Sequence, residues 1–209
     1  MHRTSSSVRD KWQAPEVARH YAEARFRNRR AEARDPRLVA QLLEHAVPSP
    51  ERVLDVPCGT GRLFPTLTAR GASVVGLDAS REMLAHTERD QRVVQGDALA
   101  LPFANASFDA VVCCRLAHHL HRDEDLARLL DELARVARRW VLLSFWDAGA
   151  LPPWRKRVGL KRSEGARGRI ARSRRELAHA LAAAGLEPRE YRTSLRFVSQ
   201  QTFVLAEKR

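Results

Sequence analysis

The sequence predicts an α/β fold with a mainly parallel sheet of seven strands and helices on both faces. Short apolar runs alternate with helix-like segments, which is typical of a parallel sheet, and place strands at 52–57, 73–77, 92–95, 109–114, 139–146, 188–196 and 200–207. The first three runs each end near a carboxylate, at Asp55, Asp78 and Asp97. Because a ligand of such a sheet lies outside the carboxyl ends of its strands, these acids predict a nucleoside-binding edge.

A glycine-containing turn follows the first strand, in the run Val56-Pro57-Cys58-Gly59-Thr60-Gly61-Arg62. Glycine presents backbone N–H groups with little side-chain bulk, so Gly59 and Gly61 would let a ligand approach the backbone closely. Pro57 suits the last residue of the strand at 52–57, but it has no N–H to donate to the ligand.

Two helices are expected before the first strand. The first covers 14–31 with a proline in its first turn, and Asp35-Pro36 ends it. Apolar residues at helical spacing predict the second helix over 38–46, which should pack on the sheet. We expect residues 1–46 to form an N-terminal helical cap on a domain of residues 47–209.

Four more helices are expected inside that domain, at 61–70, 80–89, 123–138 and 173–184. Ser80 is a suitable N-cap for the second of them. The third begins with three acidic residues and closes with Arg135, Arg138 and Arg139, which complements the helix dipole at both ends. A basic insertion rich in proline, glycine and arginine, residues 147–172, precedes the last helix.

Length and composition fit one domain with room for a lid. With 209 residues and 44% hydrophobic residues, the chain can bury a sizeable core. No apolar run reaches the length of a membrane span, so no stable membrane insertion is expected, and the polar start lacks the apolar core of a secretory signal. Three cysteines predict no disulfide framework. We therefore expect a cytoplasmic protein, and the abundant arginine and alanine are typical of a GC-rich bacterial genome.

The net charge of +12 is unevenly distributed along the chain. Counting Lys and Arg against Asp and Glu gives +5 for residues 1–37, −3 for 38–150, +9 for 151–175 and +1 for 176–209. The positive charge therefore flanks a nearly neutral middle. Such asymmetry predicts either an anionic partner or an arginine-rich surface that keeps the chain in solution.

Four motifs in the order and spacing of one enzyme family occur in this chain. They are Leu54-Asp55-x-x-Cys58-Gly59-Thr60-Gly61, Gly76-Leu77-Asp78-Ala79-Ser80-x-x-Met83-Leu84, Gly96-Asp97-Ala98-x-x-Leu101-Pro102-Phe103 and Ser107-Phe108-Asp109. Residues 50 to about 146 thereby resemble a class I S-adenosylmethionine-dependent methyltransferase of the type 11 kind. The resemblance implies a Rossmann-like fold with an antiparallel last strand, and S-adenosylmethionine as cofactor. The family usually has glycine at the position of Pro57.

The resemblance also implies a cofactor site formed by Asp55, Pro57, Cys58, Gly59, Gly61, Asp78, Ala79, Met83, Asp97, Ala98, Arg115 and Leu116. Asp78 would accept hydrogen bonds from the ribose hydroxyls, as a carboxylate does for dinucleotides. Asp97 with Ala98 would meet the adenine, and Asp55 would order the turn and reach the methionine ammonium through water. The remaining side chains would pack on the adenosine (Ala79, Met83) or line the sulfonium pocket (Arg115, Leu116).

Catalytic residues are less defined, because methyl transfer from a sulfonium mainly requires an aligned acceptor. A base is needed only when the acceptor must lose a proton. His118 or His119 could be that base, since imidazole titrates near neutrality, or both could pack against the sheet. Tyr21 could contact the sulfonium through its ring or belong to a simple cover helix. No metal site is expected, because Cys113 and Cys114 are adjacent and would face opposite ways on a strand.

These features predict methyl transfer to a small or medium-sized acceptor, which the basic segments suggest is anionic. The insertion at 147–172 could be a substrate lid, could grip phosphate or a membrane surface, or could be a solvated loop. Two alternatives stay open: a nucleic-acid methyltransferase that uses the basic segments on phosphates, and a non-catalytic cofactor-binding protein.

A dehydrogenase is disfavoured by the glycine pattern. The run Gly59-Thr60-Gly61-Arg62-Leu63-Phe64 lacks the third small residue of a dinucleotide fingerprint. Bulky Phe64 would stand where that small residue gives a close contact between helix and strand.

Overall fold

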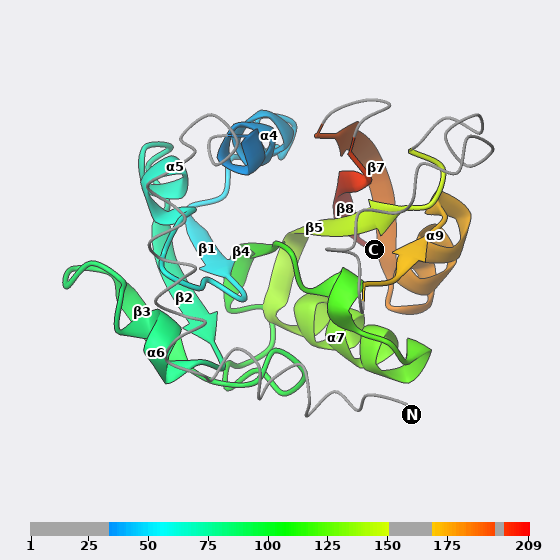
Figure 1. Ribbon diagram of the computed structural model, residues 1–209. Helices are drawn as coiled ribbons and strands as arrows, with labels where there is room; N and C mark the ends of the chain where they lie inside the picture. The colour runs from blue at the N-terminus through cyan, green and yellow to red at the C-terminus, as the bar shows by residue number, and fades with distance from the viewer. Residues whose placement is uncertain (1–33, 151–168, 195–198) are drawn as a thin grey trace.

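A mixed sheet lies at the centre of the computed structural model, which describes residues 34–150, 169–194 and 199–209 (Figure 1). Its strands are β1 (Arg52–Asp55), β2 (Ser73–Asp78), β3 (Arg92–Gln95), β4 (Phe108–Cys113), β5 (Ala137–Asp147), β6 (Ala171–Arg172), β7 (Leu186–Thr193) and β8 (Gln201–Lys208). Their order is β3-β2-β1-β4-β5-β8-β7, and β6 pairs with β5. β8 is antiparallel to both of its neighbours, whereas the other pairs are parallel. The predicted mainly parallel sheet is confirmed, with β6 as an additional strand.

Two strand predictions need correction. β6 has only two residues and lies in the segment expected to be an insertion. It contains no apolar run that would predict a strand. β1 ends at Asp55 rather than at residue 57. The next residue, Val56, still donates its N–H to Val112 O at 2.9 Å, but Pro57 lies in the turn beyond the strand and is not the strand's last residue.

One face of the sheet is covered by α4 (Arg34–Leu43) and α5 (Phe64–Thr68) (Figure 1). α4 buries Val39, Leu42 and Leu43, which recur at the spacing of one helix face. These side chains pack in one cluster with Leu67 of α5 and Phe203 of β8.

The opposite face is covered by α7 (Asp123–Val136) and α9 (Arg174–Ala183). Leu129 and Leu133 of α7 and Leu177 and Leu181 of α9 are fully buried in one cluster. α9 begins with a capping box, in which the side chains of Ser173 and Glu176 each accept a hydrogen bond from the other residue's backbone N–H. Helices on both faces of the sheet are therefore confirmed.

The end of α7 differs from the prediction. The helix ends at Val136, and β5 begins at the next residue. Arg138 and Arg139 therefore lie on the strand and do not cap the helix dipole. They pair instead with acids of neighbouring strands: Arg138 Nη1 lies 3.1 Å from Asp109 Oδ1, and Arg139 Nε lies 2.8 Å from Glu207 Oε1.

The helices around the predicted cofactor edge are shorter than expected. α5 replaces the helix expected at 61–70, and α6 (Arg81–Leu84) replaces the one expected at 80–89. Ser80 is the N-cap of α6 as predicted, since its Oγ accepts from Met83 N at 3.2 Å. Before the first strand, Asp35-Pro36 lies in the first turn of α4 and therefore does not mark the end of a helix. The helix expected at 14–31 and most of the basic insertion lie outside the described residues, and the division at residue 46 stays a prediction.

Gly76 on β2 explains how the bulky Phe64 fits after the glycine turn. A Cβ atom at Gly76 would lie 2.9 Å from Phe64 Cε2 and 2.8 Å from Cys58 Sγ. The close contact that a small residue on the helix would provide is thus provided by a glycine on the strand.

We expect Gly76→Ala to lower the free energy of unfolding by about 1–3 kcal/mol, because the new methyl group overpacks a closed contact. Urea denaturation of the two proteins measures this difference. Ser73→Ala is a suitable control, since Ser73 is an exposed residue of the same strand. An unchanged unfolding midpoint in Gly76→Ala would contradict the packing at this site.

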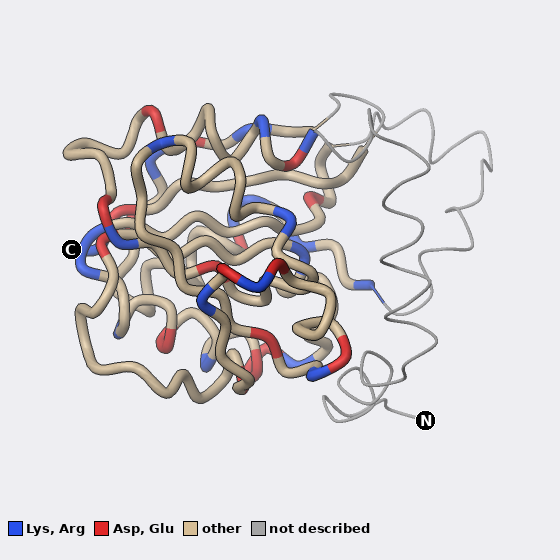
Figure 2. Tube along the Cα trace, turned by 90° about the vertical axis from the view of Figure 1, so that its left-hand side faces the viewer, with Lys and Arg blue, Asp and Glu red and all other residues tan. Residues whose placement is uncertain are grey.

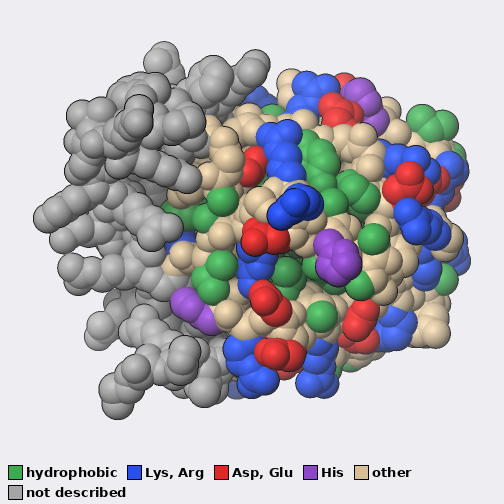
Figure 3. Space-filling model, turned by 90° about the vertical axis from the view of Figure 1, so that its right-hand side faces the viewer, with side chains coloured by type: hydrophobic (Ala, Val, Ile, Leu, Met, Phe, Trp, Pro, Cys, Tyr) green, Lys and Arg blue, Asp and Glu red, His purple; other side chains and the backbone are tan. Residues whose placement is uncertain are grey.

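Acidic and basic residues are distributed along the whole described trace (Figure 2), and both kinds are interspersed on the face that Figure 3 shows. The described residues carry a net charge of about +2 of the chain's +12, by counting Lys and Arg against Asp and Glu. Most of the excess positive charge therefore belongs to residues 1–33 and 151–168. No described helix combines the length and apolar character needed to cross a bilayer.

Candidate functional site

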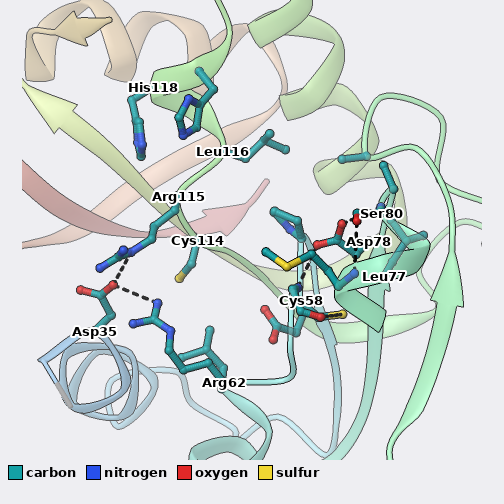
Figure 4. A pocket seen from close by; sticks show the side chains of 18 of the residues that line it. Asp35, Cys58, Arg62, Leu77, Asp78, Ser80, Cys114, Arg115, Leu116 and His118 are labelled. Atoms are coloured by element: carbon teal, nitrogen blue, oxygen red, sulfur yellow. Dashed lines mark hydrogen bonds and ion pairs between the residues drawn. The ribbon is translucent and has the colours of Figure 1, made fainter. Parts of the chain in front are cut away.

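A cavity of about 450 Å³ opens at the carboxyl ends of β1, β2 and β4. Its position follows from the topology, because the strand order reverses at β1: β2 lies on one side of β1 and β4 on the other. In an open parallel sheet, such a reversal leaves a crevice at the carboxyl ends of the strands. The side chains around it come from strand ends, the turn after β1, α4 and the segment after β4 (Figure 4).

The turn after β1 is fixed by backbone hydrogen bonds and by glycine. Cys58 N donates to Leu77 O at 2.9 Å, and Gly59 N donates to Asp78 Oδ2 at 2.8 Å. Gly59 and Gly61 have φ angles of 55° and 75°, in the left-handed region that glycine adopts without strain. The turn can therefore bring its backbone close to a ligand.

Asp78 holds the two loops of the cavity together. Its Oδ2 accepts from Gly59 N, and its Oδ1 accepts from Ser80 N at 2.9 Å. Burial raises the pKa of this carboxyl group, and the backbone N–H donors oppose the shift. Each carboxylate oxygen can accept more than one hydrogen bond, so Asp78 can hold the turn and bind a ligand hydroxyl at once.

Asp55 is the most unusual group in the cavity wall. Its side chain is 1% exposed, and neither carboxylate oxygen accepts a hydrogen bond from the described part of the chain. Burial raises its pKa to about 8, although the positive charge of Arg62 acts in the opposite direction. A buried carboxyl group without a partner is costly unless a donor or cation completes it, and an ammonium group fits that requirement.

The adenine side of the predicted site is formed by Asp97, Ala98 and Leu99, which line the cavity next to Ala79 and Met83. Asp97 Oδ1 accepts from Leu99 N at 3.0 Å, which orients the carboxylate at the end of β3. The apolar side chains of Ala79 and Met83 can contact the flat face of a base.

A cluster of one acid and two arginines closes the other end. Asp35 Oδ2, on α4, lies 2.9 Å from Arg62 Nη2 and 2.7 Å from Arg115 Nε. Asp35 is buried, so the arrangement ties α4 to the glycine turn and to the residue that follows β4 (Figure 4).

The two histidines lie beside this cluster. His118 is buried and stacks on Trp146, with the two ring centroids 5.5 Å apart. The ring centroids of His118 and His119 lie 4.4 Å apart. Burial lowers the pKa of His118 to about 2, and the neighbouring charges of Arg169 and Arg115 act in the same direction. A histidine that binds a proton so weakly is a poor base, which favours the packing interpretation for His118.

The structure brings most of the predicted site together. Of the predicted cofactor residues, only Gly61 does not line the cavity; those that do are Asp55, Pro57, Cys58, Gly59, Asp78, Ala79, Met83, Asp97, Ala98, Arg115 and Leu116. His118 and His119 line it as well, whereas Tyr21 lies outside the described residues. Cys113 and Cys114 pack in opposite core clusters, as their adjacency predicted.

Several lining residues carried no recognisable signal in the sequence. They are Asp35, Arg62, Cys114, Trp146 and Arg169. Arg62 directly follows the glycine turn, and this position is the one feature of the sequence that could have indicated that it lines the cavity. The pair of Asp35 with Arg115 joins positions 80 residues apart, so no local pattern could reveal it.

Comparison with known proteins identifies related sequences. Residues 54–144 match a family model described as a methyltransferase domain. The demethylmenaquinone methyltransferase of Thermobifida fusca is 36% identical over 128 residues, which cover 54% of this chain and 53% of that protein. The malonyl-[acyl-carrier protein] O-methyltransferase of Erwinia pyrifoliae is 48% identical over 73 residues, which cover 33% and 28% of the two chains. The chain spans about half the length, or less, of the curated relatives it matches.

Solved structures share this fold. The magnesium protoporphyrin IX methyltransferase of Synechocystis PCC 6803 with bound SAH has a TM-score of 0.76 at 21% identity, and the match covers 99% of this chain and 100% of that one. The same enzyme with bound SAM has a TM-score of 0.70 at 20% identity, over 98% and 96% of the chains. The predicted resemblance to a methyltransferase is confirmed by the family model, and the two solved structures contain SAH and SAM, which agrees with the predicted cofactor.

Proposed function

We propose that this chain transfers a methyl group from S-adenosylmethionine to a small or medium-sized acceptor, since residues 54–144 match a family model described as a methyltransferase domain. The observation that carries the proposal is the Gly59–Asp78–Asp55 cradle. It combines a turn open to close approach, a carboxylate placed for a ribose and a buried acid that has no partner among the described residues.

Each end of the cradle suits one part of the cofactor. Asp78 would bind the ribose hydroxyls, and Asp97 would accept from the exocyclic amine of the adenine, as in the expectation from sequence. Asp55 would face the methionine ammonium, whose positive charge would stabilise the ionised form of this buried acid. When bound, the cofactor supplies an activated methyl group, so the protein needs mainly to align the acceptor.

The acceptor would lie beyond the sulfur, between Arg115, His118 and Trp146. The stacked rings of Trp146 and His118 form a flat wall, which suits a planar or apolar acceptor. In this proposal the space would hold a small or medium-sized molecule. The curated relatives that match include enzymes named for demethylmenaquinone and for malonyl-[acyl-carrier protein].

Two measurements test the proposal. Isothermal calorimetry should detect S-adenosylhomocysteine binding, and tritium from methyl-labelled S-adenosylmethionine should enter an acceptor from a small-molecule cell extract. Binding without any transfer would favour the non-catalytic cofactor-binding alternative. Absence of binding would contradict the cofactor site itself.

Nucleic acid is the second candidate acceptor, and the uneven charge favours it. Residues 1–37 and 151–175 carry +5 and +9, and a protein that neutralises phosphates loses affinity steeply as salt rises. Labelled tRNA and rRNA fragments should be tested beside small acids. A transfer rate to RNA that falls steeply between about 50 and 200 mM salt, at an unchanged cofactor affinity, would select this candidate.

A further inference from the structure

Charge divides the cavity into two ends. Asp55, Asp78 and Asp97 line the cofactor end, whereas the opposite end is lined by Arg34, Asp35, Arg62, Arg115 and Arg169. The single acid of this second group is buried and paired to two of the arginines. The end of the cavity beyond the cofactor is therefore positively charged and suits an anion.

Arg115 is held in place by three features. Its φ angle of 65° is unusual for a residue with a side chain, and its backbone N–H donates to the buried Ser144 Oγ at 2.7 Å. Its Nε donates to Asp35 at 2.7 Å. The two terminal nitrogens donate to no described residue, and 44% of the side chain is exposed. Strained backbone at such a position is typical of sites where a side chain is positioned for a ligand.

Arg169 lies on the other side of this space. Its guanidinium lies 5.0 Å from the centre of the Trp146 ring, which in turn stacks on His118. The neighbouring Ile170 N donates to His118 O at 2.8 Å and joins this segment to the residues after β4. Two guanidinium groups thus border an aromatic wall beside the expected position of the methyl group.

The described side chains at this end offer little general-base capacity. His118 binds a proton weakly, because burial lowers its pKa to about 2, and burial raises the pKa of Cys114. Asp35 is engaged by Arg62 and Arg115. His119 is the other histidine that lines this end of the cavity.

We infer that the methyl acceptor is a carboxylate, bound by Arg115 and Arg169 against the Trp146–His118 wall, and that the product is a methyl ester. The inference rests on the proposed function and deepens it. A carboxylate oxygen forms the new bond to the methyl carbon, the carbon–sulfur bond breaks, and its electron pair stays on sulfur. No proton moves, since the acceptor is already an anion, so the reaction requires no base.

The stability of the transferred label in alkali identifies the acceptor atom for any substrate. The enzyme is incubated with methyl-tritiated S-adenosylmethionine and a small-molecule cell extract, and in parallel with benzoate, indole-3-acetate and decanoate, each beside its amide. We expect label in the extract or the acids, absent from the amides, and released as volatile methanol by alkali. Label that withstands alkali would overturn the inference and leave the proposed function intact, whereas no transfer at all would contradict both.

Variants test the assigned residues. Arg115→Met should raise the KM for the labelled acceptor about 10- to 100-fold, the effect of losing a charged hydrogen bond, at an unchanged affinity for S-adenosylhomocysteine. Arg115→Lys should recover part of this loss. Arg139→Met, which removes an exposed arginine outside the cavity lining, should have no effect.

Two results would overturn the assignment. If Arg115→Met weakens S-adenosylhomocysteine binding to the same degree, the arginine serves the methionine carboxylate of the cofactor and not the acceptor. If His119→Ala abolishes transfer at an unchanged cofactor affinity, the acceptor must lose a proton and is not a carboxylate.

Discussion

Asp78→Asn should weaken S-adenosylhomocysteine binding by at least about 100-fold. The carboxylate accepts from Gly59 N and Ser80 N, and in the proposed function it would accept from the ribose as well. An amide keeps the shape, but its NH₂ group would then face one of these donors. Loss of the two charged hydrogen bonds to the ribose hydroxyls, each worth about 1.5–3 kcal/mol, corresponds to at least this fall in affinity. Titration calorimetry at one pH and salt concentration measures it.

The effect must be separated from a general loss of the fold. Asp131→Asn is the matched control, because Asp131 is an exposed acid on α7 that does not line the cavity. It should bind S-adenosylhomocysteine like the parent protein. Thermal unfolding without ligand should show a folded Asp78→Asn protein with a lower midpoint. An unchanged affinity in this variant would refute the assignment of the ribose contact.

The sequence predicted which residues come together at this edge of the sheet, because the determinants of the edge are local. Strands β1, β2 and β3 each end close to an acid, and the glycine turn is a continuous run of residues. Once the sheet is parallel, its topology alone brings Asp55, Asp78 and Asp97 to one edge. This is why residues that are far apart along the chain could be assigned together.

The parts that the sequence did not predict depend on distant contacts. α5 begins three residues later than expected because Arg62 and Leu63 still belong to the turn that lines the cavity. The Asp35–Arg115 pair joins α4 to the end of β4, and a charged residue gives no indication of its partner. The role of Gly76 is also a property of packing, since it accommodates Phe64 from a different element.

Asp55 gives rise to a pH dependence of stability. In the folded chain its pKa is raised from 3.8 to about 8, so between these values the folded state holds a proton that the unfolded state lacks. The associated stability is complete below about pH 4 and is lost as pH rises through 8. The whole effect corresponds to roughly 6 kcal/mol. Asp55→Asn, which cannot ionise, should therefore lose less stability than the parent protein between about pH 5 and 9, as measured by urea denaturation.

The same proton should be linked to cofactor binding. An ammonium group beside Asp55 would lower the pKa of this acid, so binding at about pH 7 should release a proton, and affinity should rise with pH up to about 8. Calorimetry with S-adenosylhomocysteine in phosphate and in Tris, whose ionisation heats differ, counts the protons released. Asp55→Asn should release fewer protons and show a flatter pH profile of affinity. Equal proton release by both proteins would place the ammonium away from Asp55.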